Sequence, residues 1–235
     1  MTPLLVATGL TMAGRLHPLD LALAAGTLTA VIGPNGSGKT SLLRSLARID
    51  QPGGSVRIQD EELDRFPPAR RAAMLGFLPA ARDMIWPIRV RDLVGLGLQR
   101  ADDWRMDELL EKLELVHLAE READRLSTGE RARALVARVL APRPAVLLLD
   151  EPLSNLDPYW VLMILQVLRE AADGGAAVLL TLHDLHLLGQ FDRVLLMDGG
   201  RLVEDDVPEL ITKRSSLAAT FRVEPGISGW RLRSG

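Results

Sequence analysis

The segment that most restricts the fold is TLTAVIGPNGSGKTSLLRSLARI, which begins at Thr27. An apolar run at residues 28–32 is followed by a glycine-rich turn, and then by apolar residues at helical spacing. This pattern predicts a strand, a tight loop and a helix in direct succession. Residues 33–40 fit the pattern G-x-x-x-x-G-K-[ST], and they lie between the strand and the helix, as a phosphate-binding loop requires. The chain is therefore expected to have an α/β fold that binds a nucleotide.

The loop supplies the groups that phosphate binding needs. Its glycines let successive backbone N–H groups curl around a phosphate, and the helix N-terminus adds partial positive charge. Lys39 is expected to reach the β- and γ-phosphates, and the Thr40 hydroxyl to bind Mg²⁺. A chance match in a glycine-rich turn is the alternative, and the strand and helix on either side disfavour it. The predicted nucleotide contacts here are Gly33, Pro34, Asn35, Gly36, Ser37, Gly38, Lys39, Thr40 and Ser41.

A second apolar strand, at residues 146–149, leads directly into Asp150 and Glu151. Open α/β sheets bind ligands at the carboxyl ends of their strands, so both carboxylates are expected beside the phosphate loop. Asp150 is predicted to hold Mg²⁺, directly or through water, and Glu151 to polarise the attacking water. A solvated acidic turn is the alternative for an Asp-Glu pair.

His183 follows another apolar strand, at residues 177–182. Its side chain is expected at the same sheet edge as Asp150, where it would donate a hydrogen bond to a phosphate or to water. A lone histidine is more often structural, but its place at a third strand end favours a catalytic role. The spacing of His183 and His186 is only a weak metal-binding pattern, because no third ligand lies nearby.

The segment LSTGE, residues 126–130, precedes a helical pattern. Ser127 and Glu130 have the spacing of a capping box, in which each side chain accepts a hydrogen bond from the other residue's backbone N–H. A helix start with an exposed serine and Gly129 is also an anion-binding site, so the structural and the functional interpretations are compatible.

The rest of the chain suggests one globular unit. The turn signal at residues 52–54 precedes a short alternating strand, residues 90–140 have a mostly helical pattern, and the segment from residue 215 reads as a loose tail. Absence of cysteine fits a reducing compartment, and no apolar run reaches the ~20 residues that cross a bilayer. The chain has a net charge of −3 and no basic stripe, so nucleic-acid binding is not expected. These features together predict a soluble cytoplasmic protein.

Taken in order, GPNGSGKT, LSTGE, VLLLDE, SNLD (residues 154–157) and TLHD resemble the nucleotide-binding subunit of ABC transporters, over about residues 5–210. The resemblance implies a P-loop NTPase core with an antiparallel β subdomain and a helical signature subdomain. It implies one ABC ATPase domain over residues 1–235. The core and β subdomain would take about residues 1–80 and 141–214, the helical subdomain about 81–140, and the tail 215–235.

The resemblance also implies a second copy of the chain as partner. In the family two such domains face each other head to tail, and each ATP lies between one phosphate loop and the partner's signature segment. SNLD would cross that interface beside Glu151, while the pair Asp157-Pro158 also fits a helix cap with proline at N1. The implied additional nucleotide contacts are Ser127, Thr128, Gly129, Glu130 and Asp157.

In this family the helical subdomain docks onto a membrane-spanning permease. The segment MIWPIRVRDLVGLG, residues 84–97, resembles that of ATPases that drive uptake of iron-siderophore, haem or cobalamin. A packed Trp86-Pro87 turn before an amphipathic helix at residues 90–98 is an equally compatible interpretation. The implied function is ATP hydrolysis that powers import, on the cytoplasmic face of the inner membrane, with membrane contact only through the permease. The alternatives are a non-transport ABC ATPase that acts on nucleic acid or ribosomes, and a catalytically weak nucleotide-dependent regulator.

Three positions depart from the family pattern. Ala80, shortly after a predicted strand at residues 74–78, stands where the family usually has a Mg²⁺-ligating glutamine, so a water, or Asp83, would have to replace it. Thr128 replaces a glycine, and its β-branched side chain is expected to slow closure of the dimer. Third, no aromatic residue precedes Phe66 to stack on adenine. The candidates that remain for this contact are Leu10, Met12 and His17.

Overall fold

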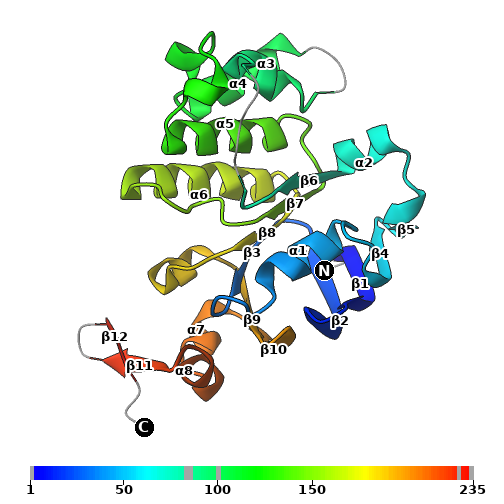
Figure 1. The fold of residues 1–235 in the computed structure, drawn as a ribbon, viewed down its shortest axis with the longest axis vertical. Helices are drawn as coiled ribbons and strands as arrows, with labels where there is room; N and C mark the ends of the chain where they lie inside the picture. Colours follow the sequence, from blue (N-terminus) through cyan, green and yellow to red (C-terminus); the bar gives the residue numbers. More distant parts are fainter. Residues whose placement is uncertain (1–2, 82–86, 99–101, 227–228, 233–235) are drawn as a thin grey trace.

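The computed structural model describes residues 3–81, 87–98, 102–226 and 229–232, and Figure 1 shows its arrangement. The predicted Trp86 turn and Asp83 lie outside the described residues. The strands are β1 Pro3–Met12, β2 Leu16–Ala24, β3 Thr27–Ile32, β4 Gly53–Ile58, β5 Glu61–Glu62, β6 Leu75–Leu78, β7 Val146–Leu149, β8 Ala177–Thr181, β9 Arg193–Asp198, β10 Arg201–Asp206, β11 Val223–Gly226 and β12 Gly229–Leu232. The α-helices are α1 Lys39–Leu46, α2 Pro68–Met74, α3 Val90–Gly95, α4 Asp103–Lys112, α5 Thr128–Leu140, α6 Pro158–Asp173, α7 Pro208–Ile211 and α8 Ser215–Phe221. Short 3-10 turns are η1 Leu63–Arg65, η2 Val116–Leu118, η3 Ala123–Arg125 and η4 Leu185–Gln190.

The main sheet has six strands in the order β10-β9-β3-β8-β7-β6. Strands β9, β3, β8, β7 and β6 are parallel, and β10 pairs antiparallel with β9. Strands β7 and β8 are buried at every position, which explains why their sequences VLLL and AVLLT show no polar alternation. Since β3, β7 and β8 are parallel neighbours, the segments that follow them emerge at one edge of the sheet.

Successive side chains of these strands enter two different hydrophobic clusters. Leu147 and Leu149 of β7 pack with α5 and α6, whereas Val146 and Leu148 pack with α1 and the antiparallel sheet. This follows from the alternation of side chains along a strand. Helix α1 therefore lies between the two sheets (Figure 1).

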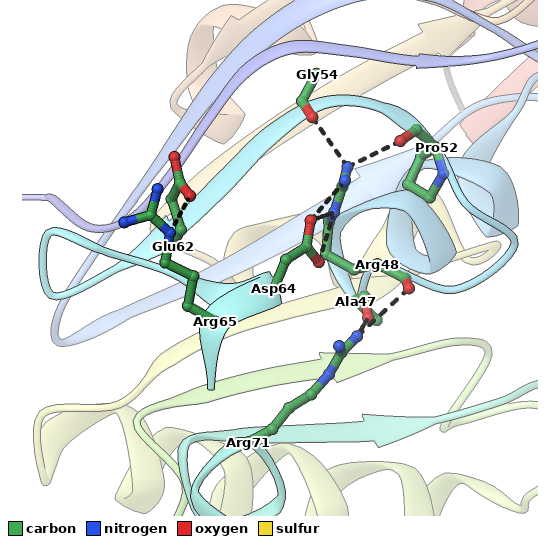
Figure 2. Close-up of polar contacts among 8 residues, drawn as sticks. All are labelled: Ala47, Arg48, Pro52, Gly54, Glu62, Asp64, Arg65 and Arg71. Carbon is green, nitrogen blue, oxygen red and sulfur yellow. Dashed lines mark hydrogen bonds and ion pairs between the residues drawn. The ribbon is translucent and has the colours of Figure 1, made fainter. Parts of the chain in front are cut away.

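The smaller sheet is antiparallel, in the order β2-β1-β4-β5, and polar contacts join it to the end of α1. Figure 2 shows the guanidinium of Arg48, which donates to the Asp64 carboxylate, at 2.9 Å, and to the Pro52 carbonyl, at 3.0 Å. Arg71 of α2 donates to the carbonyl of Ala47, at the last turn of α1. Cations at the carbonyl end of a helix are favourable, so these contacts fix α1 from its far end.

The predicted helical block is present as α3, α4 and α5, which gather at one end of the molecule (Figure 1). Asp102 caps α4, since its side chain accepts the Arg105 N–H at 3.0 Å. The same hydrophobic cluster contains Val90, Leu109 and Leu135 from these helices together with strands of the main sheet. The block is thus packed onto the sheet face that carries α6.

Two sequence-based expectations need correction. The segment from residue 215 is not a loose tail over its first part, because it forms α8, and Leu217 is 1% exposed within the larger cluster. Strand β6 begins at Leu75 rather than at Met74, which is the last residue of α2. The edge strand β10 was not anticipated.

Among the residues that the structure describes, no helix is both long and apolar enough to span a membrane.

Candidate functional site

Three strand ends bring the predicted residues to one edge of the main sheet. Gly33 follows β3, Asp150 follows β7, and His183 lies two residues beyond β8. Backbone hydrogen bonds continue the pairing past the strands: Asp150 N–H donates to the Leu78 carbonyl at 2.8 Å, and Leu182 N–H to the Val31 carbonyl at 2.9 Å. The positions of these side chains are therefore set by the sheet itself.

The phosphate loop requires glycine at its two ends. Gly33 has φ +151°, and a Cβ there would lie 2.2 Å from the Met197 carbonyl oxygen and 2.6 Å from the Ser37 Oγ. Gly38 precedes α1 with φ +101°, and a Cβ there would lie 3.1 Å from the Arg15 carbonyl oxygen. A side chain at either position would collide with neighbouring backbone, so the local fold depends on glycine.

Lys39 is held inside the loop that precedes it. Its ammonium donates to the Gly33 carbonyl at 2.8 Å and to the Pro34 carbonyl at 3.1 Å, and the residue is only 6% exposed. Burial lowers the pKa of Lys39, while the nearby charges of Glu151 and Asp150 act in the opposite direction. A buried cation beside two carboxylates is suited to meeting the additional negative charge of phosphates.

Ser37 offers a test of whether this loop fits an anion. Its Oγ is buried and has no hydrogen-bond partner among the residues that the structure describes. A buried polar atom without a partner costs free energy, so an acceptor at this point would satisfy it. The loop therefore fits a phosphate group.

Asp150 and Glu151 are connected by a threonine of the neighbouring strand. Thr181 donates its hydroxyl proton to Asp150 Oδ1, at 2.9 Å, and its Oγ1 accepts the Glu151 N–H, at 2.6 Å. Asp150 is 1% exposed, and Glu151 has the left-handed backbone angle φ +51°. Thr181 was not among the predicted site residues, because its role depends on which strands are neighbours.

The Glu151 carboxylate is fixed from two sides. Its Oε1 lies 2.9 Å from His183 Nε2, and its Oε2 accepts from the Ser154 hydroxyl at 3.2 Å. The pKa of Glu151 is lowered, and the hydrogen bond with His183 is the largest cause. The charge of Lys39 also lowers this pKa, whereas burial of the carboxylate raises it. Glu151 thus stays an ionised acceptor at the sheet edge, as a residue that polarises water must.

A cavity of about 1000 Å³ joins these residues to the turn between β1 and β2. It extends from Lys39 and Glu151 to Met12 and His17, with Thr40 and Ser41 also in its lining. None of its lining residues, all of which lie in the described ranges, is Phe, Tyr or Trp. Leu10 is 0% exposed in the core and does not line the cavity, so it is excluded as an adenine contact.

The structure adds a part of the cavity wall that the sequence did not indicate. Gly200, after β9, donates its N–H to the Ser37 carbonyl at 2.9 Å, and its own carbonyl accepts the His17 N–H at 2.8 Å. The turn after β9 therefore connects the phosphate loop with the β1–β2 hairpin.

The LSTGE segment forms the predicted capping box at the start of α5. Ser127 N–H donates to Glu130 Oε2 at 2.8 Å, and Glu130 N–H donates to Ser127 Oγ at 3.3 Å. Asp157 likewise caps α6 by accepting the Trp160 N–H at 3.2 Å, with Pro158 at N1. Ser127, Thr128, Gly129, Glu130 and Asp157 do not line the cavity that contains Lys39. One chain thus brings together the phosphate loop, the acidic pair and His183, but not the signature segment.

Ala80 is exposed two residues after β6, where its methyl group has no atom that can ligate a metal. No group of three or more His, Asp or Glu side chains is arranged to hold a metal within the described ranges.

Known proteins share the sequence pattern and the fold of this chain. The ABC transporter family matches residues 16–154. The hemin import ATP-binding protein of Pseudomonas fluorescens (strain Pf0-1) is 40% identical over 222 residues, which cover 89% of this chain and 87% of that protein. An ATP-binding subunit of an ABC transporter has the same fold, with a TM-score of 0.82 at 20% identity, over 91% of this chain and 94% of that one.

A dimeric ATP-binding cassette in a post-hydrolysis state, bound to ADP and Pi, also shares the fold. Its TM-score is 0.76 at 22% identity, over 87% of this chain and 98% of that one. The family match covers more than half of the sequence and includes the phosphate loop, the signature segment and the acidic strand. The chain therefore belongs to the ABC transporter family, as an ATP-binding and ATP-hydrolysing domain.

Proposed function

We propose that this chain is the ATP-hydrolysing subunit of a transporter that imports haem, or a related chelate such as an iron-siderophore or cobalamin. ATP hydrolysis is supported above all by the Glu151 carboxylate, which His183 and Ser154 hold near Lys39. The cargo class follows from the similarity to a hemin import ATP-binding protein over most of both chains.

In this proposal the phosphate loop, residues 33–41, holds the triphosphate. Backbone N–H groups at the start of α1 surround it, and Lys39 contacts the β- and γ-phosphates. The base then points toward the β1–β2 turn, where Met12 and His17 line the cavity.

Thr40 and Asp150 would hold Mg²⁺, because hydroxyl and carboxylate oxygens are ligands that this ion prefers. When bound, Mg²⁺ supplies charge neutralisation for the β- and γ-phosphate oxygens. Ala80 adds no ligand, so a water would complete that side of the coordination sphere. The Thr181 hydroxyl holds one oxygen of Asp150 in place.

Hydrolysis would proceed by in-line attack of water on the γ-phosphate. Glu151 accepts a hydrogen bond from the water and orients it, while His183 donates to the γ-phosphate or to the water. Before nucleotide binds, the hydrogen bond between the two side chains lowers the pKa of Glu151 and holds its orientation.

The signature segment would act on the nucleotide of a second copy. Ser127, Thr128, Gly129 and Glu130 are solvent-facing or partly exposed around a helix N-terminus, which attracts anions. They lie apart from the cavity of their own chain, so each site is completed by the partner in a head-to-tail dimer. Asp157 would cross that interface, and a two-fold axis completes both sites at once.

The single ATPase domain would use its helical subdomain, about residues 81–140, to contact a permease on the cytoplasmic face of the inner membrane. Core and β subdomain take about residues 1–80 and 141–214, and the remainder forms the C-terminal segment. Two rival functions are less well supported: the net charge of −3 disfavours a nucleic-acid role, and an ionised Glu151 disfavours a regulator without turnover.

The test combines ATPase and transport assays. Wild-type chain should hydrolyse ATP, and Glu151→Gln should bind ATP with little change while losing about 10²-fold or more in kcat. Co-expression with candidate permeases followed by hemin uptake into proteoliposomes tests the cargo. Hydrolysis without any co-purifying permease would favour the non-transport alternative, and a wild type without turnover would favour the regulator.

A further inference from the structure

Arg133 is a buried charge that the nucleotide site does not use. It is 4% exposed, and within the described ranges the other buried charged side chains are Lys39 and Asp150, which both belong to the catalytic edge. Arg133 lies on α5 and does not line the cavity. Burial of a guanidinium costs desolvation free energy, so neighbouring groups are expected to offset that cost through hydrogen bonds or ring contacts.

Its partners belong to two other helices. Arg133 Nη1 donates to the carbonyl of Leu113 at 2.6 Å and to that of Glu114 at 3.0 Å, where α4 ends. The guanidinium also lies over the indole of Trp160, 3.5 Å from the ring centroid, in the first turn of α6. Its Nε has no hydrogen-bond partner among the described residues, so ring stacking is a main contact of the planar group.

Further contacts join the same three helices. A Cβ at Gly129 would lie 3.4 Å from Leu156 Cδ2, so the signature segment directly abuts the SNLD segment. The Tyr159 hydroxyl donates to the Glu114 carboxylate, and the Tyr159 and Trp160 rings pack edge to face with centroids 4.8 Å apart. The N-terminal turns of α5 and α6 are thereby joined at two levels, by Gly129–Leu156 at the tips and by the Arg133–Trp160 stack farther along.

We propose that Arg133 and Trp160 are positioning residues that hold the signature segment and the SNLD segment as one unit, so that both reach a partner copy's nucleotide together. The inference rests on the proposed head-to-tail dimer. Both segments would act across the dimer interface, and neither lines the cavity that contains the phosphate loop of its own chain. A displacement of about 1 Å in groups that position a substrate reduces rates about 10²-fold. The stack fixes the distance between the signature and SNLD segments, so its loss should lower turnover and leave ATP binding to the monomer intact.

The experiment uses the full chain with four substitutions. Trp160→Leu removes the ring, Trp160→Phe keeps a smaller ring, and Arg133→Lys keeps the charge without the planar face. Trp104→Leu is the matched control, because Arg143 lies over the exposed Trp104 ring at 6.0 Å, and Trp104 is near the start of α4, at the opposite end of that helix from Leu113. Each variant is assayed for ATP binding, kcat, KM and melting temperature. ATP-dependent dimerisation is measured in a Glu151→Gln background.

We expect Trp160→Leu and Arg133→Lys to lose about 10-fold or more in kcat and in ATP-dependent dimerisation, with ATP binding to the monomer within about 2-fold of the parent. Trp160→Phe should recover a large part of the loss, and Trp104→Leu should behave like the parent. Wild-type kcat and dimerisation in Trp160→Leu and Arg133→Lys would overturn the proposal and reduce the stack to a stabilising contact.

If Trp160→Leu does not fold at the assay temperature, the conservative variants Arg133→Lys and Trp160→Phe test the proposal. Loss of kcat in folded Arg133→Lys with recovery in Trp160→Phe supports the positioning role, and parent-like turnover in both refutes it. A failure of the dimer itself is visible separately, because the parent Glu151→Gln chain would then not dimerise on ATP.

Discussion

At the residue scale, His183 lowers the pKa of the Glu151 carboxyl group. The hydrogen bond from His183 is the first cause of its lowered pKa, so the carboxylate remains charged to lower pH than an isolated one. Activity that needs the ionised form is present above this pKa and is lost as pH falls through it. Without His183 the pKa rises, and the loss begins at higher pH.

We therefore expect His183→Ala to lower kcat by about 10²-fold and to move the acid limb of the kcat–pH profile to higher pH. Ser154→Ala, which removes a longer hydrogen bond of 3.2 Å to the same carboxylate, is the control and should move the limb less. An acid limb at the same pH in His183→Ala would show that another group titrates in that range.

The base end of the cavity gives a second residue-scale prediction. Its lining residues include Met12 and His17 but no Phe, Tyr or Trp, so adenine lacks a large aromatic ring to stack on there. A base–aromatic stack is worth about 1–3 kcal/mol, which corresponds to about 5- to 150-fold in affinity. We expect modest ATP affinity with little preference over GTP, and tighter binding in His17→Tyr. Competition titrations check this, and a strong ATP preference in the parent chain would contradict it.

The sequence was sufficient for residues whose place follows from strand order. Lys39, Asp150 and Glu151 meet because parallel strands end at one edge, and this could be predicted from apolar runs that end in polar residues. Thr181 and Gly200 could not be found in that way, since their contacts depend on which strand lies beside which. Leu10 was mistaken for a cavity residue, because strand alternation in β1 could not be assigned to a face without its partners.

At the element scale, the helix starts were predictable because local chemistry fixes them. Ser127 and Asp157 cap α5 and α6 as their side chains indicated. Strand β10 was missed because its sequence RLVEDD is mostly charged, and only its pairing with β9 makes it a strand. Helix α8 was missed because its few apolar residues signal little until they meet the core.

Helix α8 can be tested through Leu217. This side chain is 1% exposed in the cluster that also contains the main sheet, although the sequence suggested a loose tail. Leu217→Ala should lower the free energy of unfolding by about 2–3 kcal/mol, because it leaves a cavity. Urea denaturation measures this, with exposed Leu210→Ala, at 45% exposure, as a control that should change little. Equal stability of the two variants would mean that α8 does not pack as described.

At the scale of the whole molecule, the separation of the signature segment from the cavity predicts cooperation between two chains. Gly129 tolerates a side chain in the monomer, since a Cβ would make only an ordinary 3.4 Å contact with Leu156. An aspartate there also suits the first turn of a helix. In the dimer, however, its charge would face the partner's γ-phosphate.

We thus expect Gly129→Asp to keep its melting temperature and its nucleotide binding, yet to lose about 10²-fold in kcat. In a Glu151→Gln background, the same substitution should also abolish most of the ATP-dependent dimerisation. Gly129→Ala, without the charge, should retain much more of both. Light scattering with and without ATP measures the dimer. If Gly129→Asp dimerised and hydrolysed ATP like the parent, the signature segment would not meet the nucleotide.

Ala80 lies where hydrolysis would be transmitted to a permease. Ala80 follows β6, which pairs with β7, and β7 in turn carries Asp150 into the site. This residue therefore connects the catalytic edge with the segment that enters the helical subdomain, but its methyl group can neither ligate Mg²⁺ nor donate a hydrogen bond. Since Mg²⁺ tolerates water in its coordination sphere, basal hydrolysis should not need a side chain at this position, whereas transmission of movement should.

Ala80→Gln restores an amide, and we expect a basal ATPase rate within about 3-fold of the parent but a larger stimulation of that rate by permease and substrate. Ala80→Ser, which is polar but too short to reach the metal, is the matched control and should behave like the parent. ATPase assays of the assembled transporter, with and without substrate, separate the two quantities. If Ala80→Gln changed neither the basal rate nor its stimulation, this strand end would have no part in coupling, and the movement would have to reach the permease through α3 to α5 alone.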